Sequence, residues 1–288
     1  MTSVEVAIIG GSGLYKMAGL DDVESRQIST PFGDPSDEIV LGTLHGRRVA
    51  FLPRHGRGHV LMPSEVPYRA NIFALKTLGV KYLVSISACG SLREAYAPGH
   101  VVIPDQLFDF TRERPRTFFG HGLVAHVSTA NPFSAELSRA LAGAVGAAGG
   151  TVHEGGSFIT IEGPRFSTIA ESNTYRQWGM DVIGMTTSPE AFLALEAEMA
   201  YSVMAHVTDY DVWHESEEPV TVDMVVQTLR HNAALAQRAV SHLVEHMEAW
   251  QGDYPAHHAL RDAIITDRQH VARGIKEELA PLVAKYLS

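Results

Sequence analysis

The stretch DVIGMTTSPEAFLALEAEMAYSVMAHVTDYD, residues 181–211, contains a complete strand–helix–strand unit. Residues 181–185 form a short apolar run that predicts a strand. Residues 188–190, Ser-Pro-Glu, have the signature of a helix start: a capping serine, a proline at the first helical position and an acid in the first turn. The helix leads into a second apolar run, residues 201–207, which predicts a buried strand. This strand ends in the polar segment Thr208-Asp209-Tyr210-Asp211.

The same alternation of strands and helices extends along the whole chain. Further strands are predicted at residues 4–9, 38–53 (a hairpin), 82–87, 101–108 and 158–161. Further helices are predicted at residues 64–79, 134–148, 168–179, 221–250 and 259–287. Strands that alternate with helices indicate an α/β fold with a mostly parallel central sheet. Because no repeat or polar linker divides the chain, we expect residues 1–250 to form one domain and residues 251–288 a helical extension packed on it.

Composition excludes several classes of protein. The 288 residues are 45% hydrophobic and 19% charged, enough for a sizeable core and unlike a disordered tail or a coiled coil. The single cysteine, Cys89, excludes an intramolecular disulfide and fits a reducing compartment. With 23 basic and 33 acidic residues and no basic block, nucleic acid and anionic membranes are poor partners. The first apolar run is only about six residues long and follows no basic segment, so we expect a soluble cytoplasmic protein rather than one with a signal peptide or membrane span.

Ligands of parallel sheets bind at the carboxyl ends of the strands, and here those ends carry unusual polar clusters. The first is Gly10-Gly11-Ser12-Gly13, where exposed N–H groups and the Ser12 hydroxyl suit an anion. A dinucleotide fingerprint would need a further glycine where Lys16 stands, so that interpretation fails. A plain tight turn remains an equal alternative.

The second cluster is Arg54-His55-Gly56-Arg57-Gly58-His59. A guanidinium fork beside an imidazole suits a phosphate group. The glycines between the two histidines argue against a helix that would align them, so no metal site is expected here. A solvated basic loop is the alternative.

Three further strand ends mix small, apolar and hydrogen-bonding groups, as a small-molecule pocket requires. They are Ser87-Ala88-Cys89-Gly90-Ser91, Glu162-Gly163-Pro164-Arg165-Phe166-Ser167 and Gly184-Met185-Thr186-Thr187. Cys89 has no activating neighbour and is interpreted as a small buried residue rather than a nucleophile. Ordinary turn chemistry would also explain these segments.

The last cluster holds two carboxylates, Asp209 and Asp211, which point the same way in an extended chain. At the end of a buried strand such a pair is costly unless it is paired or protonated. The alternative is a solvent-facing acidic loop that continues into Glu215, Glu217 and Glu218.

Taken together, seven segments of the chain resemble the trimeric purine nucleoside phosphorylase family. They are AIIGGSGLY, TPFGDPSD, RHGRGHVLMPSEVPYRANIFALK, ACGSLRE, ITIEGPRFST, IGMTTSPE and TDYDVWHESEE, in this order from residue 7 to about 230. The resemblance implies a twisted mixed sheet, partly closed as a barrel, flanked by helices and assembled as a homotrimer. It implies phosphorolysis of 5′-methylthioadenosine to adenine and 5-methylthioribose 1-phosphate. Inorganic phosphate is then a co-substrate, and neither a metal nor an organic cofactor is expected.

The resemblance also assigns residues to roles. Those matched to phosphate binding are Ser12, Arg54, His55, Ser87, Ala88 and Thr186. Those matched to the base and the ribose are Phe166, Ser167, Met185, Asp209 and Asp211. Val222, Val225 and Val226 fall where the family builds its apolar 5′ pocket, and His126 matches a histidine lent to the neighbouring subunit's site.

The chemistry of the two acids agrees with this assignment. Cleavage of the N-glycosidic bond leaves negative charge on the purine, which needs a proton at N7. Burial and the neighbouring Asp211 would keep Asp209 protonated for that purpose, while Asp211 accepts from the N6 amino group. Relatives that act on 6-oxopurines place a glutamate where Ser167 stands and an asparagine where Asp209 stands. Ser167 and Asp209 therefore favour 6-aminopurines. The alternatives are phosphorolysis of 6-oxopurine nucleosides (methylthioinosine, inosine or guanosine) and a non-catalytic nucleotide-binding protein.

Overall fold

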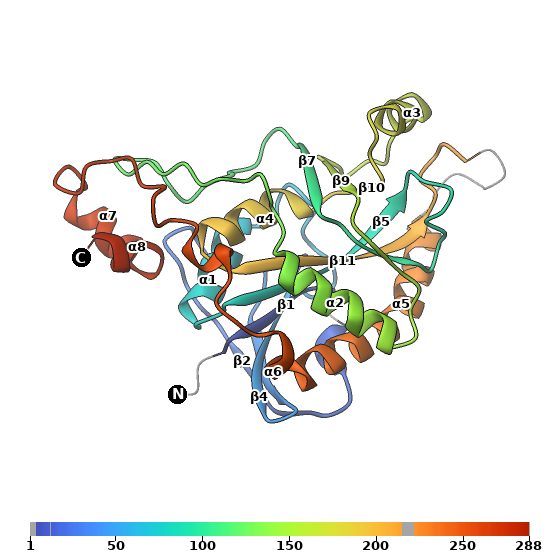
Figure 1. Ribbon diagram of the computed structural model, residues 1–288, viewed down its shortest axis with the longest axis horizontal. Coiled ribbons are helices and arrows are strands. Elements are labelled where there is room, and N and C mark those ends of the chain that lie inside the picture. The colour runs from blue at the N-terminus through green and yellow to red at the C-terminus, as the bar shows by residue number, and fades with distance from the viewer. Residues whose placement is uncertain (1–3, 12, 215–221, 288) are drawn as a thin grey trace.

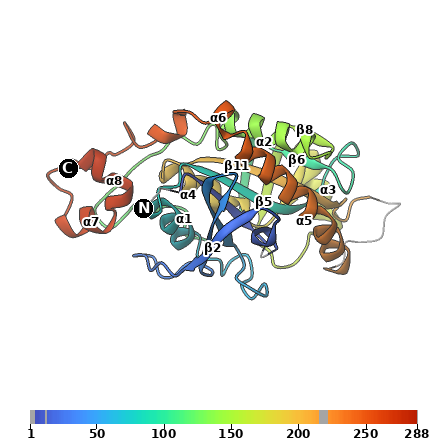
Figure 2. The same ribbon diagram turned by 90° about the horizontal axis from the view of Figure 1, so that it is seen from below.

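The computed structural model describes residues 4–11, 13–214 and 222–287. Of Tyr15 and residues 222–231 it describes the backbone but not the side chains. A mixed sheet lies at the centre, with helices on both of its faces (Figures 1 and 2). Its strands are β1 (Val6–Gly10), β2 (Leu20–Arg26), β3 (Ile39–Leu44), β4 (Arg47–Pro53), β5 (Tyr82–Ser91), β6 (Val101–Ile103), β7 (Gln106–Phe110), β8 (Val152–Glu154), β9 (Ser157–Ile161), β10 (Val182–Gly184) and β11 (Ala200–Asp209).

Strand β5 is the branch point of the sheet. It pairs in parallel with β1 and β11 and antiparallel with β10. One path through the sheet runs β2-β3-β4-β1-β5-β10-β9-β7, while β11 leads away from β5 to β6 and then β8. The predicted α/β fold with a mixed sheet and flanking helices is confirmed. The sheet is mixed at β5 because this strand has both parallel and antiparallel neighbours.

The two faces of the sheet bury two separate sets of apolar side chains. Ile8 packs in a cluster with residues of α2 (Ala135–Ala147) and α5 (Val222–Glu245). Its neighbour Ile9 packs in the opposite cluster, with residues of α1 (Tyr68–Thr77), α4 (Thr187–Glu196) and α8 (Ala280–Leu287). Successive strand residues point to opposite faces, so a continuous apolar run such as β1 serves both clusters. None of the helices in the described ranges is both long and apolar enough to cross a membrane.

Parallel pairing places the predicted site loops at one edge of the sheet. Strands β4, β1, β5 and β11 run in the same direction, so their carboxyl ends meet. Gly10 lies opposite Pro53, and after an irregularity in the pairing Asp209 lies opposite Gly90. The loops that follow these strands therefore lie close together, as the sequence predicts.

Several predicted boundaries are wrong. Helix α1 begins at Tyr68 rather than at residue 64, because Val66-Pro67 interrupts helical geometry. The predicted strand 101–108 is two strands, β6 and β7. The long helix stops at Glu245 and is followed by α6 (Met247–Trp250). The remaining short helices are α3 (Ile169–Gln177), α7 (Arg273–Glu278) and the 3₁₀ turns Leu14–Lys16 and Pro255–His258.

The tail is less helical than its apolar spacing suggests. Within residues 259–287 only α7 and α8 are α-helical. Leu260, Leu282 and Val283 nevertheless belong to the same apolar cluster as α1 and α4. The tail thus packs against the main body of the chain.

Candidate active site

Predicted phosphate-binding residues from three separate segments lie side by side. The Ser87 and Thr186 hydroxyl oxygens are 3.5 Å apart. Arg54 is tied to the same region, because its Nη1 donates to the Ile86 carbonyl at 3.2 Å. A Cβ added to Gly184 would lie 3.4 Å from the Ala88 carbonyl oxygen, so the end of β10 passes close to Ala88 in β5. Ser12 lies outside the described residues.

The Arg54 side chain is not a free cation at the surface. It is 2% exposed, and its Nε and Nη2 donate to the two carboxylate oxygens of Glu190 at 2.7 and 2.9 Å. Nη2 also donates to Ser85 Oγ at 2.6 Å, and Tyr201 donates its hydroxyl to Glu190 at 2.8 Å. Burial alone would lower the pKa of Arg54, but the Glu190 carboxylate more than offsets this and raises it.

Glu190 and Tyr201 were missed by reasoning from the sequence. The sequence identifies Glu190 only as an acid in the first turn of a helix. Its position between Pro189 and the apolar run Ala191–Leu195 is the one signal that would have found it, because a fully buried carboxylate needs a charged partner. Nothing in the local sequence identifies Arg54 as that partner.

His55 lies beside Arg54 but is uncharged at neutral pH. Burial, and then the Arg54 charge, lower the pKa of His55 to about 4. Nδ1 donates to the Leu61 carbonyl at 2.8 Å, so in the neutral ring Nε2 is an acceptor. The ring stacks on His59 with centroids 4.2 Å apart. The neutral ring therefore offers an anion no positive charge.

The predicted acid pair is buried at the end of β11. Asp209 and Asp211 are 8% and 7% exposed, which excludes a solvent-facing loop at these two positions. Asp209 accepts from the Thr208 hydroxyl at 2.6 Å and from the Asp211 main-chain N–H at 2.8 Å. Gly90 allows this arrangement, because a Cβ there would lie 3.0 Å from Asp209 Oδ1 and 3.3 Å from Asp211 Cβ.

Burial perturbs both acids. It raises the pKa of Asp209 to about 6; the Asp211 charge adds to the rise and the hydrogen bonds from Thr208 and the Asp211 N–H oppose it. Burial also raises the pKa of Asp211, against the opposing effect of the Ser172 and Ser167 hydroxyls. Those two hydroxyls lie outside normal hydrogen-bond geometry. Within the described part of the chain, Ser167 Oγ, Ser172 Oγ and Asp211 Oδ2 are buried without a hydrogen-bond partner, which suits a polar ligand between them.

The loop after β9 packs against the predicted ribose-contacting methionine. Gly163 has φ +68°, and a Cβ there would lie 2.6 Å from Met185 Sδ. The buried side chain of Arg114, also missed from the sequence, joins the two segments by donating to the Met185 and Glu162 carbonyls at 2.6 and 2.7 Å. Phe166, at the end of this loop, is 37% exposed.

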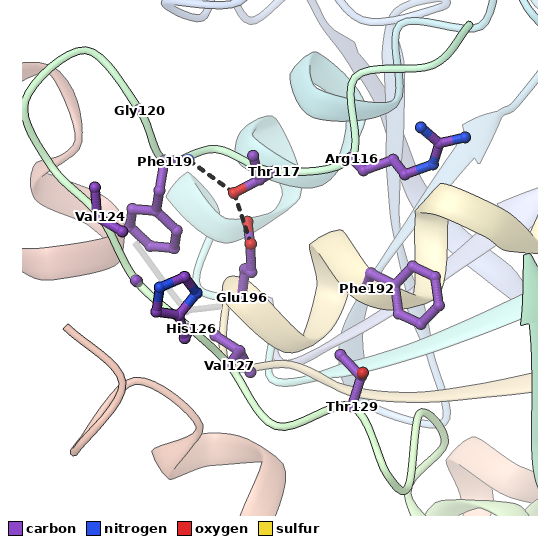
Figure 3. A pocket seen from close by; sticks show the side chains of 11 residues that line it. Arg116, Thr117, Phe119, Gly120, Val124, His126, Val127, Thr129, Phe192 and Glu196 are labelled. Carbon is purple, nitrogen blue, oxygen red and sulfur yellow. Dashed lines mark hydrogen bonds between the residues drawn. The ribbon is translucent and has the colours of Figure 1, made fainter. Parts of the chain in front are cut away.

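His126 lies in a different part of the chain. It lines a pocket of about 440 Å³ between the segment that follows β7 and helix α4 (Figure 3). Glu196, across this pocket, accepts from the Thr117 hydroxyl at 2.7 Å, and burial raises its pKa to about 7. The described residues that line it are Arg116, Thr117, Phe119, Gly120, Val124, Ala125, His126, Val127, Thr129, Phe192 and Glu196. None of the other predicted site residues whose side chains are described lines this pocket. The side chains of Val222, Val225 and Val226, at the start of α5, lie outside the described residues.

A family model, described as the phosphorylase superfamily, matches residues 5–245. The chain belongs to this family. The match covers every strand that contributes to the acid pair and to the hydroxyls near Arg54, so the resemblance drawn from the seven sequence segments is confirmed.

Individual members of the phosphorylase superfamily are similar to the chain over nearly its whole length. S-methyl-5′-thioadenosine phosphorylase of Chloroflexus aurantiacus is 54% identical over 289 residues, covering 100% of both chains. The enzyme of the same name from Gloeobacter violaceus is 53% identical over 98% of this chain and 95% of its own. A methylthioadenosine phosphorylase structure from an antarctic soil metagenomic library has a TM-score of 0.94 at 50% identity, covering 98% of this chain and 100% of its own. The Schistosoma mansoni enzyme in complex with adenine has a TM-score of 0.82 at 35% identity and 98% coverage of both chains.

Proposed function

We propose that this phosphorylase catalyses the reversible phosphorolysis of 5′-methylthioadenosine to adenine and 5-methylthioribose 1-phosphate. The observation that carries the proposal is the buried Asp209–Asp211 pair at the end of β11, with a pKa of about 6 at Asp209. The names of the similar enzymes agree with this substrate. We further propose that the enzyme acts in the cytoplasm, in purine and methionine salvage.

We propose that the phosphate binds at the Ser87 and Thr186 hydroxyls and at the main-chain N–H groups of His55 and Ala88. The Arg54 guanidinium and the segment that contains Ser12 complete the proposed site. Hydroxyls and N–H groups at a strand end suit an anion. Held against C1′, a phosphate oxygen forms the new bond to C1′ as the C1′–N9 bond breaks and its electron pair passes to the purine. The bound phosphate also stabilises the positive charge that develops on the ribose. Met185 is proposed to pack against the ribose.

The base is proposed to bind at the two acids, with Phe166 at the edge of the pocket. Asp209 would give its proton to N7 as the purine leaves, and a carboxyl group with a pKa of about 6 exchanges protons near neutral pH. Asp211, with the Ser167 and Ser172 hydroxyls facing it, would accept from the N6 amino group of adenine. The alternative substrates, 6-oxopurine nucleosides, present an acceptor at that position and would leave Asp211 without a donor.

Product analysis tests the reaction and the substrate together. The protein is incubated with methylthioadenosine, adenosine, methylthioinosine and inosine, with and without phosphate, and the released bases are identified. We expect phosphate-dependent release of adenine, with a specificity constant for methylthioadenosine roughly 10–200-fold above that for adenosine, because Val222, Val225 and Val226 match the family's apolar 5′ pocket. Val225→His is expected to narrow this ratio by offering a partner to the 5′-hydroxyl. Hypoxanthine as the favoured product, or release without phosphate, would contradict the proposal.

A homotrimer in which His126 completes the neighbouring subunit's site is part of the proposal. Its support is the pocket of about 440 Å³ that His126 lines (Figure 3). We expect light scattering to give three times the 31.3 kDa chain mass. His126→Ala is expected to lower the specificity constant for methylthioadenosine without changing that mass. A monomeric active enzyme, or a His126→Ala trimer with unchanged kinetics, would contradict this assembly.

A further inference from the structure

The end of helix α5 carries three metal-ligating side chains that the proposed reaction does not use. The sequence His242-Leu243-Val244-Glu245-His246 places two histidines four residues apart, with a glutamate between them. One possible ligand atom from each of these three side chains lies within 4.8 Å of those of the other two. Leu243 and Val244 are buried beneath them, while Glu245 and His246 are exposed and His242 is half-buried. The cluster lies where α5 meets α6, at the far end of the helix from Val222 (Figures 1 and 2).

The backbone holds the two histidines at helical spacing although α5 formally ends at Glu245. The main-chain N–H of His246 donates to the His242 carbonyl at 3.1 Å, as in a continuing helix. Residues four apart on a helix project from the same face. The two imidazole rings lie together, with centroids 4.0 Å apart.

A second hydrogen bond fixes the tautomer of His246. Its Nδ1 lies 3.0 Å from the His242 carbonyl oxygen, which only accepts, so Nδ1 carries the proton. In the neutral ring Nε2 then carries the lone pair. Metal-bound histidines typically donate their other ring N–H to a carbonyl or carboxylate in this way. Among the described residues, no hydrogen bond or ion pair occupies the His242 ring nitrogens or the Glu245 carboxylate.

We propose that His242, Glu245 and His246 form a surface site for one divalent ion of the zinc class. Two imidazoles and one carboxylate suit Zn²⁺, Cu²⁺ or Ni²⁺, whereas Mg²⁺ and Ca²⁺ prefer sets made entirely of oxygen. Ligands about 2.0–2.1 Å from a tetrahedral zinc ion lie about 3.3 Å apart, so small side-chain rotations from the present separation suffice, with water as the fourth ligand. The negative end of the α5 dipole also favours a cation here.

An ion at this site links His242 to His246 across the junction of α5 and α6. Because it binds the folded arrangement of the three side chains, it stabilises the folded protein by mass action. The site lies outside the phosphate and base sites, so occupation is expected to leave phosphorolysis unchanged.

The test uses the full chain without an affinity tag. Zinc is titrated against a chromophoric indicator, and thermal unfolding is followed in parallel. We expect one zinc ion per chain, a melting temperature that rises with zinc concentration, stronger competition by Cu²⁺, and none by Mg²⁺ or Ca²⁺. His242→Ala and His246→Ala are each expected to weaken zinc binding at least about 10-fold.

His258→Ala is the matched control, because it removes another surface histidine that is already hydrogen-bonded to Asp253 at 2.7 Å. It is expected to bind zinc as the parent does. Glu245→Gln leaves both imidazoles in place and is expected to weaken binding less than either histidine variant. Unchanged affinity in His242→Ala or His246→Ala, or an equal loss in His258→Ala, would overturn the site.

Discussion

Replacement of Asp209 by asparagine is expected to lower turnover of methylthioadenosine by a factor on the order of 10²–10⁴, the effect of removing a general acid. Asparagine keeps the size of the side chain but cannot transfer a proton to N7. The surroundings tolerate the amide. Its oxygen can still accept from the Asp211 N–H, while the Thr208 hydroxyl donates to the Cys89 carbonyl at 3.2 Å and accepts from the amide nitrogen.

The base preference separates a catalytic from a structural role. The amide of Asp209→Asn can turn its N–H toward a 6-oxo group, so the loss on methylthioinosine is expected to be smaller than the loss on methylthioadenosine. Specificity constants for both nucleosides, measured on folded protein, give the ratio. An unchanged ratio with near-normal turnover would end the assignment of Asp209 as the proton donor.

Although Asp209→Asn is expected to lower turnover, it is expected to make the folded protein more stable at neutral pH. Burial raises the pKa of Asp209 from an ordinary value near 4 to about 6, so the folded state binds this proton more tightly than the unfolded state does. The free energy of unfolding is therefore lowered by this group at higher pH. The loss is absent below pH 4, grows as the pH rises to 6, and then stays constant at about 3 kcal/mol. Asp209→Asn removes this loss and should be the more stable protein at pH 7 but not at pH 4. Denaturant unfolding at several pH values measures this difference, and parallel profiles for the two proteins would contradict it.

Much of the site could be placed from the sequence because its parts are local. Short stretches of sequence are enough to recognise the apolar runs of β1, β5 and β11. The same holds for the glycines that follow β1 and those near the end of β5. The rule that parallel strands end at one edge of a sheet then brings the following loops together. Ser87 and Thr186, 99 residues apart in the chain, meet for another reason: β10, which precedes Thr186, pairs antiparallel with β5, which contains Ser87.

Other parts of the site could not be placed because they depend on long-range pairing. Arg54 and Glu190 are 136 residues apart, and the sequence around either residue does not identify the other as its partner. Arg114 likewise joins segments 48 to 74 residues away. The three neighbours of β5 cannot be read from its sequence, since a strand buried on both faces shows the same apolar run whatever it pairs with. The sequence predicts a more helical tail than the structure has, because the apolar Leu260 reaches the core from irregular backbone rather than from a helix.

Glu190→Gln is expected to lower the free energy of unfolding by about 3–5 kcal/mol, because it leaves the Arg54 guanidinium buried without a charged partner. Arg54→Ala is expected to cost a similar amount by stranding Glu190. Either single variant therefore confounds folding with phosphate binding. Denaturant unfolding measures the loss. A change below about 1 kcal/mol would show that this buried pair contributes no more to stability than an ordinary surface ion pair does.

A triple variant resolves the two roles of Arg54. Arg54→Met with Glu190→Leu and Tyr201→Phe replaces the buried pair and the hydroxyl that donates to it, and such apolar replacements are often neutral or stabilising. The variant should fold with most of the parent's stability. If Arg54 also holds phosphate, the loss of a charged hydrogen bond of about 1.5–3 kcal/mol raises the phosphate KM roughly 10–150-fold, while the affinity for the nucleoside changes little. A folded triple variant with the parent's phosphate KM would make Arg54 a structural residue and leave phosphate to the hydroxyls and main-chain N–H groups.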